Sequence, residues 1–241
     1  MTEPARAPIA GAFGGGGLFG IGYALGILDT LRERGVDMSR APMIGTSAGS
    51  WAAAATALGV TYEQLSALEV PRFPNPRSGV LARSARRVFG AGFVPNVNAV
   101  ACSLPRLKRV ELYGASTPIH QMVAASSAVP ALLAPQRIKG TLYVDGGVRS
   151  GVSVDLAAPA DVLIVIAPLA GAMFGPFNDI VERNTHEEIA GWHATHSGRV
   201  VLFAPSHLTS RAATLPHHLF DKERAMVAYD LARREALNTP L

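Results

Sequence analysis

The stretch PMIGTSAGSWAAAATAL, at residues 42–58, decides how the first part of this chain folds. A short apolar run, the pentapeptide GTSAG at residues 45–49 and an alanine-rich run follow one another, which predicts a strand, a sharp turn and a helix. A serine on such a turn presents its Oγ to a substrate. Gly45 and Gly49 suit the turn, because side chains there would collide with the neighbouring strand and helix. Ser47 is therefore a candidate nucleophile.

A single GxSxG pattern is a weak signal, because glycine, serine and alanine are common in ordinary loops. A second segment, GGGGLFG at residues 14–20, lies upstream between an apolar run and a helical pattern that Gly35 is placed to end. Glycines at such a junction expose backbone N–H groups at the positive end of a helix. There they bind a phosphate or the oxyanion of an acyl-transfer intermediate, and one oxyanion donor contributes about 3 kcal/mol.

The same glycines fit a dinucleotide-binding fingerprint, Gly15-x-Gly17-x-x-Gly20. That interpretation requires an acidic residue at the end of the second strand, about twenty residues on. Asp37 has nearly the right distance, but it precedes the next apolar run instead of ending it. Nucleotide binding is therefore the less favoured alternative.

A third segment, LYVDGG at residues 142–147, places Asp145 at the end of a β-prone run and before two glycines. A carboxylate at a strand end beside a glycine turn can serve as the general base for a serine. Taken alone, an aspartate in this pattern is more often a residue of a plain Asp-Gly turn.

The three segments occur together and in order, and in this the chain resembles the patatin-like phospholipases. The linking sequence resembles that family as well: AASSAVP at residues 124–130 is similar to its helix end before a proline, and ADVLIVI at residues 160–166 is similar to the strand after its Asp motif. The resemblance covers residues 9 to about 168 well and the rest loosely.

The resemblance implies a Ser–Asp dyad without a catalytic histidine, with Ser47 as nucleophile and Asp145 as base. It implies that an oxyanion hole is lined by Gly15, Gly16 and Gly17. The glycines that support the three motifs would be Gly20, Gly45, Gly49, Gly146 and Gly147. It also implies lipid acyl esters as substrates, and neither a metal nor a cofactor.

One position departs from the family pattern. The family usually carries Arg or Lys before the last glycine of the loop, and Phe19 stands there in this chain. The missing cation can weaken the support of the oxyanion or change which head group is tolerated, but the backbone donors remain.

Length and pattern favour one α/β domain over residues 1–241. The sequence predicts strands near 8–13, 42–46, 107–113, 141–144, 161–167 and 199–204, and helices near 20–34, 47–58, 118–127, 178–196 and 218–237. This alternation predicts a mostly parallel central sheet with helices on both faces, a three-layer αβα arrangement. Because sites in such sheets lie at the carboxyl ends of strands, we expect Ser47 and Asp145 to converge there.

Charge is concentrated in one segment. Residues 70–110 contain eight Lys and Arg and no Asp or Glu, whereas the whole chain has 22 basic and 18 acidic residues. We interpret the segment as a loop-rich, cap-like insertion over the site. A helical face of Val80, Leu81, Ser84 and Val88, flanked by arginines, is typical of an interfacial helix attracted to anionic lipid. A solvated basic surface is the alternative, and no nucleic-acid-binding motif accompanies the charge.

Histidine offers a rival mechanism, because the order Ser, Asp, His of α/β-hydrolases is compatible with this chain. The histidines that follow Asp145 are His186, His193, His196, His207, His217 and His218. A metal site near His193, His196, Glu187 and Glu188 is conceivable, but there is no HExxH and no cysteine cluster, so we expect no metal.

The sequence shows no run of about 18–20 apolar residues and no signal-peptide pattern. Cys102 is the only cysteine, so no intramolecular disulfide forms, which suits a reducing compartment. We expect a cytoplasmic location, with peripheral membrane contact through the basic segment.

The sequence thus predicts a serine acyl hydrolase of lipid esters. An acyltransferase with the same site, a lipid-binding protein without turnover (motivated by Phe19) and a nucleotide-binding protein are the alternatives. Acyl chain length, head group, positional preference, oligomeric state and physiological role are not specified by the sequence.

Overall fold

A computed structural model describes residues 6–171 and 176–240 of the chain. Its centre is an eight-stranded sheet in the order β5-β6-β3-β2-β1-β7-β8, with β4 paired to β3. The strands are β1 (Ala7–Phe13), β2 (Met43–Thr46), β3 (Val97–Ser103), β4 (Lys108–Tyr113), β5 (Gln136–Ile138), β6 (Thr141–Asp145), β7 (Ala160–Ile166) and β8 (Arg199–Phe203). The five strands β3, β2, β1, β7 and β8 are parallel, whereas β4 and β6 run antiparallel to β3.

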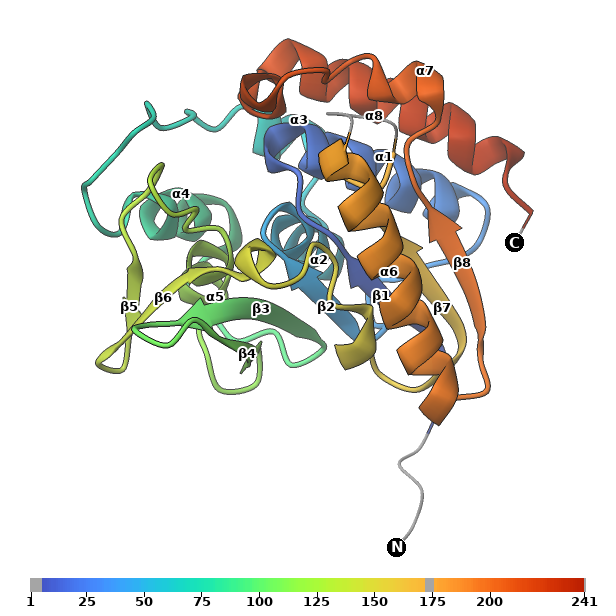
Figure 1. Cartoon of the computed structure of the whole chain (residues 1–241), viewed down its shortest axis with the longest axis horizontal. Helices are drawn as coiled ribbons and strands as arrows, with labels where there is room; N and C mark the ends of the chain where they lie inside the picture. The colour runs from blue at the N-terminus through green and yellow to red at the C-terminus, as the bar shows by residue number, and fades with distance from the viewer. Residues whose placement is uncertain (1–5, 172–175, 241) are drawn as a thin grey trace, which may run out of the picture.

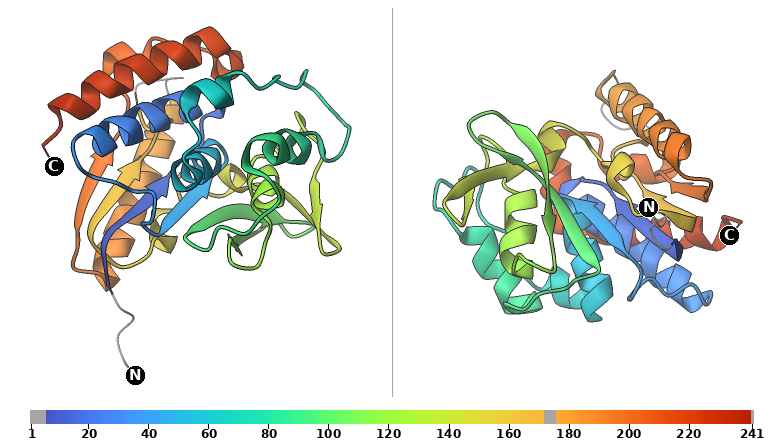
Figure 2. Two further views of the ribbon diagram at one scale, coloured as in Figure 1. Left: turned by 180° about the vertical axis from the view of Figure 1, so that it is seen from behind. Right: turned by 90° about the horizontal axis from the view of Figure 1, so that it is seen from below.

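Helices cover both faces of this sheet (Figures 1 and 2). They are α1 (Gly17–Glu33), α2 (Ala48–Leu58), α3 (Tyr62–Ser66), α4 (Val80–Phe89), α5 (Ile119–Ser126), α6 (Pro176–Thr195), α7 (His207–Ser210) and α8 (Lys222–Asn238), with 3-10 turns η1 (Gly146–Val148), η2 (Val154–Leu156) and η3 (Pro216–Phe220). In both figures α6 lies on one face, and α1, α2 and α8 lie on the other. The predicted three-layer α/β fold with a mostly parallel sheet is confirmed.

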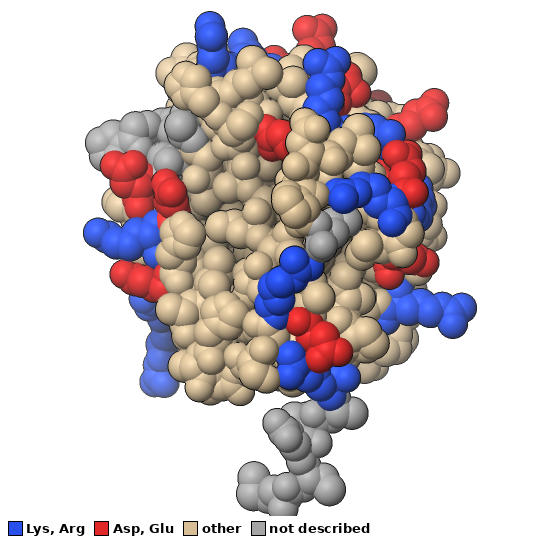
Figure 3. Space-filling view, turned by 90° about the vertical axis from the view of Figure 1, so that its right-hand side faces the viewer, with Lys and Arg blue, Asp and Glu red and all other residues tan. Residues whose placement is uncertain are grey.

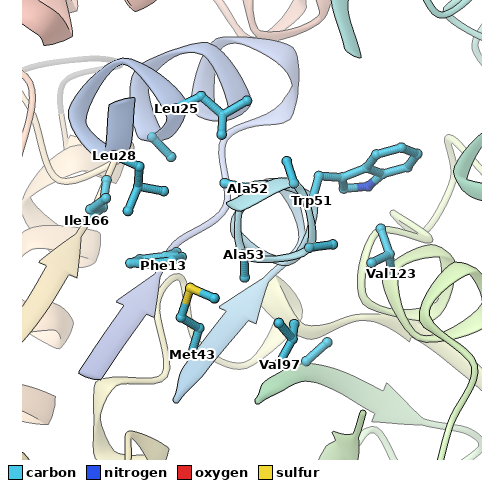
Figure 4. Close-up of a cluster of buried hydrophobic side chains, with 14 of the residues drawn as sticks. Phe13, Leu25, Leu28, Met43, Trp51, Ala52, Ala53, Val97, Val123 and Ile166 are labelled. Atoms are coloured by element: carbon cyan, nitrogen blue, oxygen red, sulfur yellow. The ribbon is translucent and has the colours of Figure 1, made fainter. Parts of the chain in front are cut away.

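The core forms because neighbouring strand residues point to opposite faces of the sheet. Phe13 and Ile166 are buried in the larger cluster with α1, α2 and α5, while Ala12 and Val165 are buried in the cluster beneath Trp192 of α6. Figure 4 shows Phe13, Met43 and Val97 beneath Ala52 and Ala53 of α2. Small residues let the helix approach the sheet closely.

Helices α1 and α8 pack against each other through glycines and alanines. A Cβ added at Gly22 would lie 2.2 Å from the carbonyl oxygen of Ala225, and one at Gly26 would lie 2.4 Å from that of Tyr229. Close helix packing therefore accounts for part of the high glycine and alanine content.

The elements predicted from sequence occur within a few residues of their expected positions, but the interpretation of residues 70–110 was wrong in its second half. Residues 97–103 form β3, a buried strand that pairs with β2, β4 and β6, so they belong to the central sheet and not to an insertion. The first half contains the expected helix as α4. The eight basic residues are therefore divided between the α4 region and the β3–β4 hairpin.

Strands β2 and β6 share one edge of β3. Residues 97–100 pair with β2 in parallel, and residues 101–103 pair with β6 in antiparallel fashion, while β4 occupies the other edge. The carboxyl ends of β2 and β6 consequently face each other beside adjacent residues of β3.

Figure 3 shows the face of the molecule that lies on the right in Figure 1. Acidic and basic residues there surround a broad area with few charges. Within the described part of the chain, no helix combines the length and the apolar character that crossing a membrane requires.

Candidate active site

Ser47 occupies the turn between β2 and α2, where it is the N-cap of the helix. Its backbone has φ 52° and ψ −119°, a conformation that is costly for a residue with a Cβ. Such strain is characteristic of a nucleophile elbow, in which the turn projects the serine out of the sheet. The side chain is 9% exposed.

The glycines on either side of Ser47 are required by contact, as the sequence predicts. A Cβ at Gly45 would lie 2.4 Å from the nitrogen of Ser50, and one at Gly49 would lie 1.9 Å from the carbonyl oxygen of Phe13. Neither approach is compatible with a side chain, so the chain can make this turn only with glycine at both positions.

Asp145 ends β6 and lies beside Ser47 in the interior, with 4% of its surface exposed. Its Oδ1 accepts a hydrogen bond from the Gly147 N–H at 2.7 Å. Burial raises the pKa of Asp145 from 3.8 to about 6, whereas the neighbouring Ser47 side chain and the Gly147 N–H act in the opposite direction. A carboxylate with this pKa is ionised near neutral pH and still basic enough to accept a proton.

Gly146 brings the turn after Asp145 close to β3. A Cβ added there would lie 2.4 Å from the carbonyl oxygen of Val100, so this position also excludes a side chain. At Gly147 the nearest atom to an added Cβ would be the Asp145 Oδ1, at 3.0 Å.

The glycine-rich loop lies against the serine, but the N–H groups of the three glycines that are predicted to line the oxyanion hole are not equivalent. A Cβ at Gly15 would lie 3.4 Å from the Ser47 Cβ, which places the loop beside the nucleophile. The Gly15 N–H, however, donates to the carbonyl of Gly151 at 2.9 Å. The Gly15 N–H is thus engaged within the protein, and the role of Gly15 in lining an oxyanion hole stays a prediction.

Gly16 and Gly17 differ from Gly15 in this respect. They begin α1 with φ values of +145° and +59°, and no acceptor among the described residues binds their N–H groups. Gly20 supports the turn, since a Cβ there would lie 3.1 Å from both the Ala48 Cβ and the Gly15 carbonyl oxygen.

Phe19 is a core residue in this structure. It is fully buried and its ring stacks on Tyr23, with ring centroids 6.4 Å apart. The position at which the family usually has a cation is thus used here for packing inside the molecule.

An apolar pocket opens at Ser47, with a volume of about 140 Å³. Its walls come from α1, α2, α3, α4, the segment between α3 and α4, the loop after α5 and the start of α8. The apolar side chains that line it include Leu18, Ile21, Trp51, Leu65, Leu68, Phe73, Leu81, Val129, Leu132 and Leu133. Asp145 lies behind the serine and not in this wall.

The end of α3 and the segment between α3 and α4 are held in place by contacts with other walls of the pocket. The Lys222 ammonium donates to the carbonyl of Ser66 at 2.8 Å, and the rings of Phe73 and Phe220 lie 4.8 Å apart. Farther along, the Asn75 N–H donates to the carbonyl of Leu132 at 2.7 Å. Residues 68–84 thus contribute a wall of the pocket.

Sequence reasoning missed the residues that hold the elbow. The Ser126 Oγ accepts the Ser47 N–H at 2.9 Å, and the Ser127 Oγ accepts Trp51 Nε1–H at 3.0 Å. Both serines belong to the AASSAVP motif, but nothing in the motif indicates which distant groups they contact.

The loop after Asp145 is held from α6 and β4. Glu188 accepts hydrogen bonds from the Ser150 hydroxyl and, at 2.9 Å, from the Val154 N–H, and it lies 3.7 Å from the Arg109 guanidinium, which also pairs with Asp155. Glu188 is thus engaged in structure, and Arg109 is not part of an open basic surface. Within the described residues, no group of three or more His, Cys, Asp or Glu side chains could hold a metal ion.

The rival mechanisms find no support in the geometry. Among the described residues, no histidine hydrogen-bonds to Ser47 or Asp145, and none lines the pocket. Asp37 accepts from Ser39 in the turn before β2, at the opposite end of that strand from Ser47, and so lies far from the glycine loop. Asp37 is therefore not at the place where the nucleotide interpretation needs a ribose-binding carboxylate.

Comparisons with known proteins give one similar solved structure and one matching family model. The crystal structure of VipD from Legionella pneumophila is similar with a TM-score of 0.46 and 14% sequence identity, over 97% of this chain and 67% of that one. No curated protein matches the chain. A family model described as patatin-like phospholipase matches residues 77–158, which include Asp145 and the AASSAVP motif. The resemblance to patatin-like phospholipases that the three motifs predict is thereby confirmed over residues 77–158.

Proposed function

We propose that the protein is a serine hydrolase of lipid acyl esters that uses Ser47 and Asp145 as a dyad. One observation carries the proposal: Ser47 stands on a strained turn, lies beside the buried Asp145 carboxylate and opens into an apolar pocket. The match to the patatin-like phospholipase family supports lipid acyl hydrolase activity in general.

In the first step, Asp145 takes the proton of the Ser47 hydroxyl as Oγ attacks the ester carbonyl. The new C–O bond gives a tetrahedral intermediate with a negative oxygen. In this proposal, the N–H groups of Gly16 and Gly17, at the positive end of α1, bind this oxygen. Asp145 then returns the proton to the leaving alcohol, and an acyl-enzyme remains on Ser47.

In the second step, water attacks the acyl-enzyme while Asp145 accepts its proton. The C–O bond to Ser47 breaks, the serine regains its proton, and the fatty acid leaves. During both steps the apolar pocket holds the acyl chain, since Ile21, Leu132 and Phe73 offer it no hydrogen-bonding partner.

Transfer of the acyl group to another alcohol is a close variant, because it differs only in which hydroxyl attacks the acyl-enzyme. A lipid-binding protein without turnover is the alternative from another class. The buried, strained placement of Ser47 and Asp145 favours a catalytic site over it, since both features cost folding free energy that lipid binding alone does not require.

The decisive experiment labels the purified chain with a fluorophosphonate and identifies the modified peptide by mass spectrometry. We expect labelling at Ser47, none in Ser47→Ala, and ester hydrolysis at least ~10³-fold lower in that variant. Ser210→Ala, a buried serine outside the site, is the matched control and should label normally. A folded wild-type chain that neither labels nor hydrolyses esters would refute the hydrolase proposal.

We further propose that the enzyme docks on anionic membranes through the arginines around α4. Arg83, Arg86 and Arg87 are exposed on this helix, while its Leu81 and Ser84 line the pocket. Phe93, just after the helix, is 56% exposed. Positive charge beside an apolar opening complements an anionic bilayer that supplies the acyl chain. A cytoplasmic location, where the free thiol of Cys102 persists, is part of this proposal.

A further inference from the structure

Three consecutive residues at the C-terminal end of α5 contact three different parts of the site. Ser126 binds the backbone of the nucleophile, Ser127 binds the ring of Trp51 in the pocket wall, and the Ala128 carbonyl accepts the Asp145 N–H at 3.0 Å. Residues 126–128 thus connect the two dyad residues, which come from distant parts of the chain.

Ser126 is the central contact of this segment. Its Oγ accepts the Ser47 N–H at 2.9 Å and donates its own proton to the carbonyl of Val100 at 2.6 Å. The side chain is 0% exposed, so water cannot replace either partner without rearrangement. The hydroxyl therefore ties the elbow to β3.

The connection to β3 matters because β3 also positions the base. Val100 is paired with Thr46, the residue before the nucleophile, and the next residue, Ala101, is paired with Asp145. A group that fixes Ser47 relative to Val100 thereby fixes it relative to Asp145.

We propose that Ser126 is a positioning residue that holds Ser47 within reach of Asp145 through this pair of hydrogen bonds. The inference rests on the proposed hydrolase function, but it concerns a residue that neither touches the substrate nor lines the pocket. Without the hydroxyl, the strained turn loses its buried partner and relaxes, and the nucleophile moves away from the base. Displacements of about 1 Å at such a site change rates by about a hundredfold.

The test compares wild type with Ser126→Ala, using a p-nitrophenyl ester that the wild-type protein hydrolyses. We expect kcat to fall about 10- to 100-fold while KM changes less than about twofold, because the pocket is intact. The rate of fluorophosphonate labelling should fall in parallel. The acidic limb of the pH profile should move to higher pH, because the Ser47 side chain, which lowers the pKa of Asp145, moves away from the carboxylate.

Ser210→Ala is the matched control. Ser210 is also a buried serine, 1% exposed, and its Oγ donates to a backbone carbonyl, that of Pro205 at 3.4 Å. It should leave kcat, KM and the pH profile unchanged. If Ser126→Ala does not fold, Ser126→Cys replaces it, because sulfur nearly preserves the volume but is a weak donor and acceptor. The same loss of kcat at constant KM is then expected.

A folded Ser126→Ala or Ser126→Cys with wild-type kcat, labelling rate and pH profile would overturn the proposal. So would a loss confined to KM, which would place Ser126 in substrate binding instead. The wild-type protein separates these results from the function itself: if it neither labels nor turns over ester, the hydrolase proposal fails first, and the ratio between variants has no meaning.

Discussion

Ser47 follows β2 and Asp145 ends β6, and these two strands run toward each other along the same edge of β3. Thr46 of β2 is paired with Val100, and Asp145 of β6 is paired with the next residue, Ala101. The serine and the carboxylate therefore meet head to head in the middle of the sheet. This arrangement explains why Asp145 is buried although its Asp-Gly sequence is typical of a turn.

The first prediction concerns pH. Burial raises the pKa of Asp145 from 3.8 to about 6, and a general base acts only when it is ionised. We therefore expect kcat/KM for a neutral ester to rise with pH through about 6 and to level off above it. Asp145→Asn should remove this limb and lower the rate by roughly 10²–10⁴-fold. A wild-type profile that is flat between pH 5 and 8 would contradict the assignment of Asp145 as the base.

The raised pKa of Asp145 also predicts that stability changes with pH in the opposite direction to activity. Because the folded pKa of Asp145 is raised, the folded state favours the protonated acid, so its contribution to stability is present at low pH and is lost as pH rises toward 6. Asp145→Asn avoids that loss, and we expect it to be more stable than wild type by roughly 2–3 kcal/mol at pH 8. Thermal melts of both proteins at pH 4 and pH 8 measure it. The advantage of the variant should shrink at pH 4, and an equal gap at both values would point to another cause.

Local steric requirements explain why the turn at Ser47 could be predicted from the sequence. The turn at Ser47 requires glycine at two fixed positions, and strand, turn and helix are contiguous, so residues 42–58 contain all the information for the elbow. Asp145 was placed correctly at a strand end. Its meeting with Ser47 was expected from parallel strands, whereas the structure achieves it with an antiparallel one.

What the sequence could not predict depends on distant contacts. β3 lies in a basic segment and is buried on both sides, so it lacks the alternation that marks a half-buried strand, and it was mistaken for part of an insertion. The partner of the Gly15 N–H is Gly151, and that of the Ser47 N–H is Ser126. Neither pairing follows from local pattern, because only the folded sheet brings these segments together.

A further prediction concerns the close approach of Gly49 to the Phe13 carbonyl at the turn that holds Ser47. Gly49→Ala puts a Cβ 1.9 Å from the Phe13 carbonyl oxygen, which the backbone must shift to avoid, and we expect the protein to be insoluble or to melt far below wild type. Gly191→Ala in α6 is the control, because nothing lies within 4 Å of its added Cβ. That exposed helical site should gain about 0.5–1 kcal/mol. Equal melting temperatures for the two variants would disprove the steric argument.

The pocket predicts selectivity for acyl chain length. Leu132→Trp narrows the cavity of about 140 Å³ that opens at Ser47. We expect KM to rise about tenfold for long-chain p-nitrophenyl esters and to change little for the acetate, since the longer chain needs the lost volume. Leu237→Trp, at a residue that is 60% exposed on α8, should have no such effect. A uniform change for all chain lengths would mean that the acyl group binds elsewhere.

Membrane docking predicts a dependence on both charge and salt. We expect the protein to sediment with vesicles that contain anionic phospholipid and to be released as salt increases, since each arginine near the surface contributes about 1 kcal/mol. Replacing Arg83, Arg86 and Arg87 by Gln should abolish this binding while hydrolysis of a soluble ester is retained. The matched control replaces three exposed arginines elsewhere, Arg40, Arg211 and Arg234, which removes the same charge. Equal losses in both triple variants would show that net charge alone governs binding, and binding to neutral vesicles that is indifferent to salt would rule out an electrostatic contact.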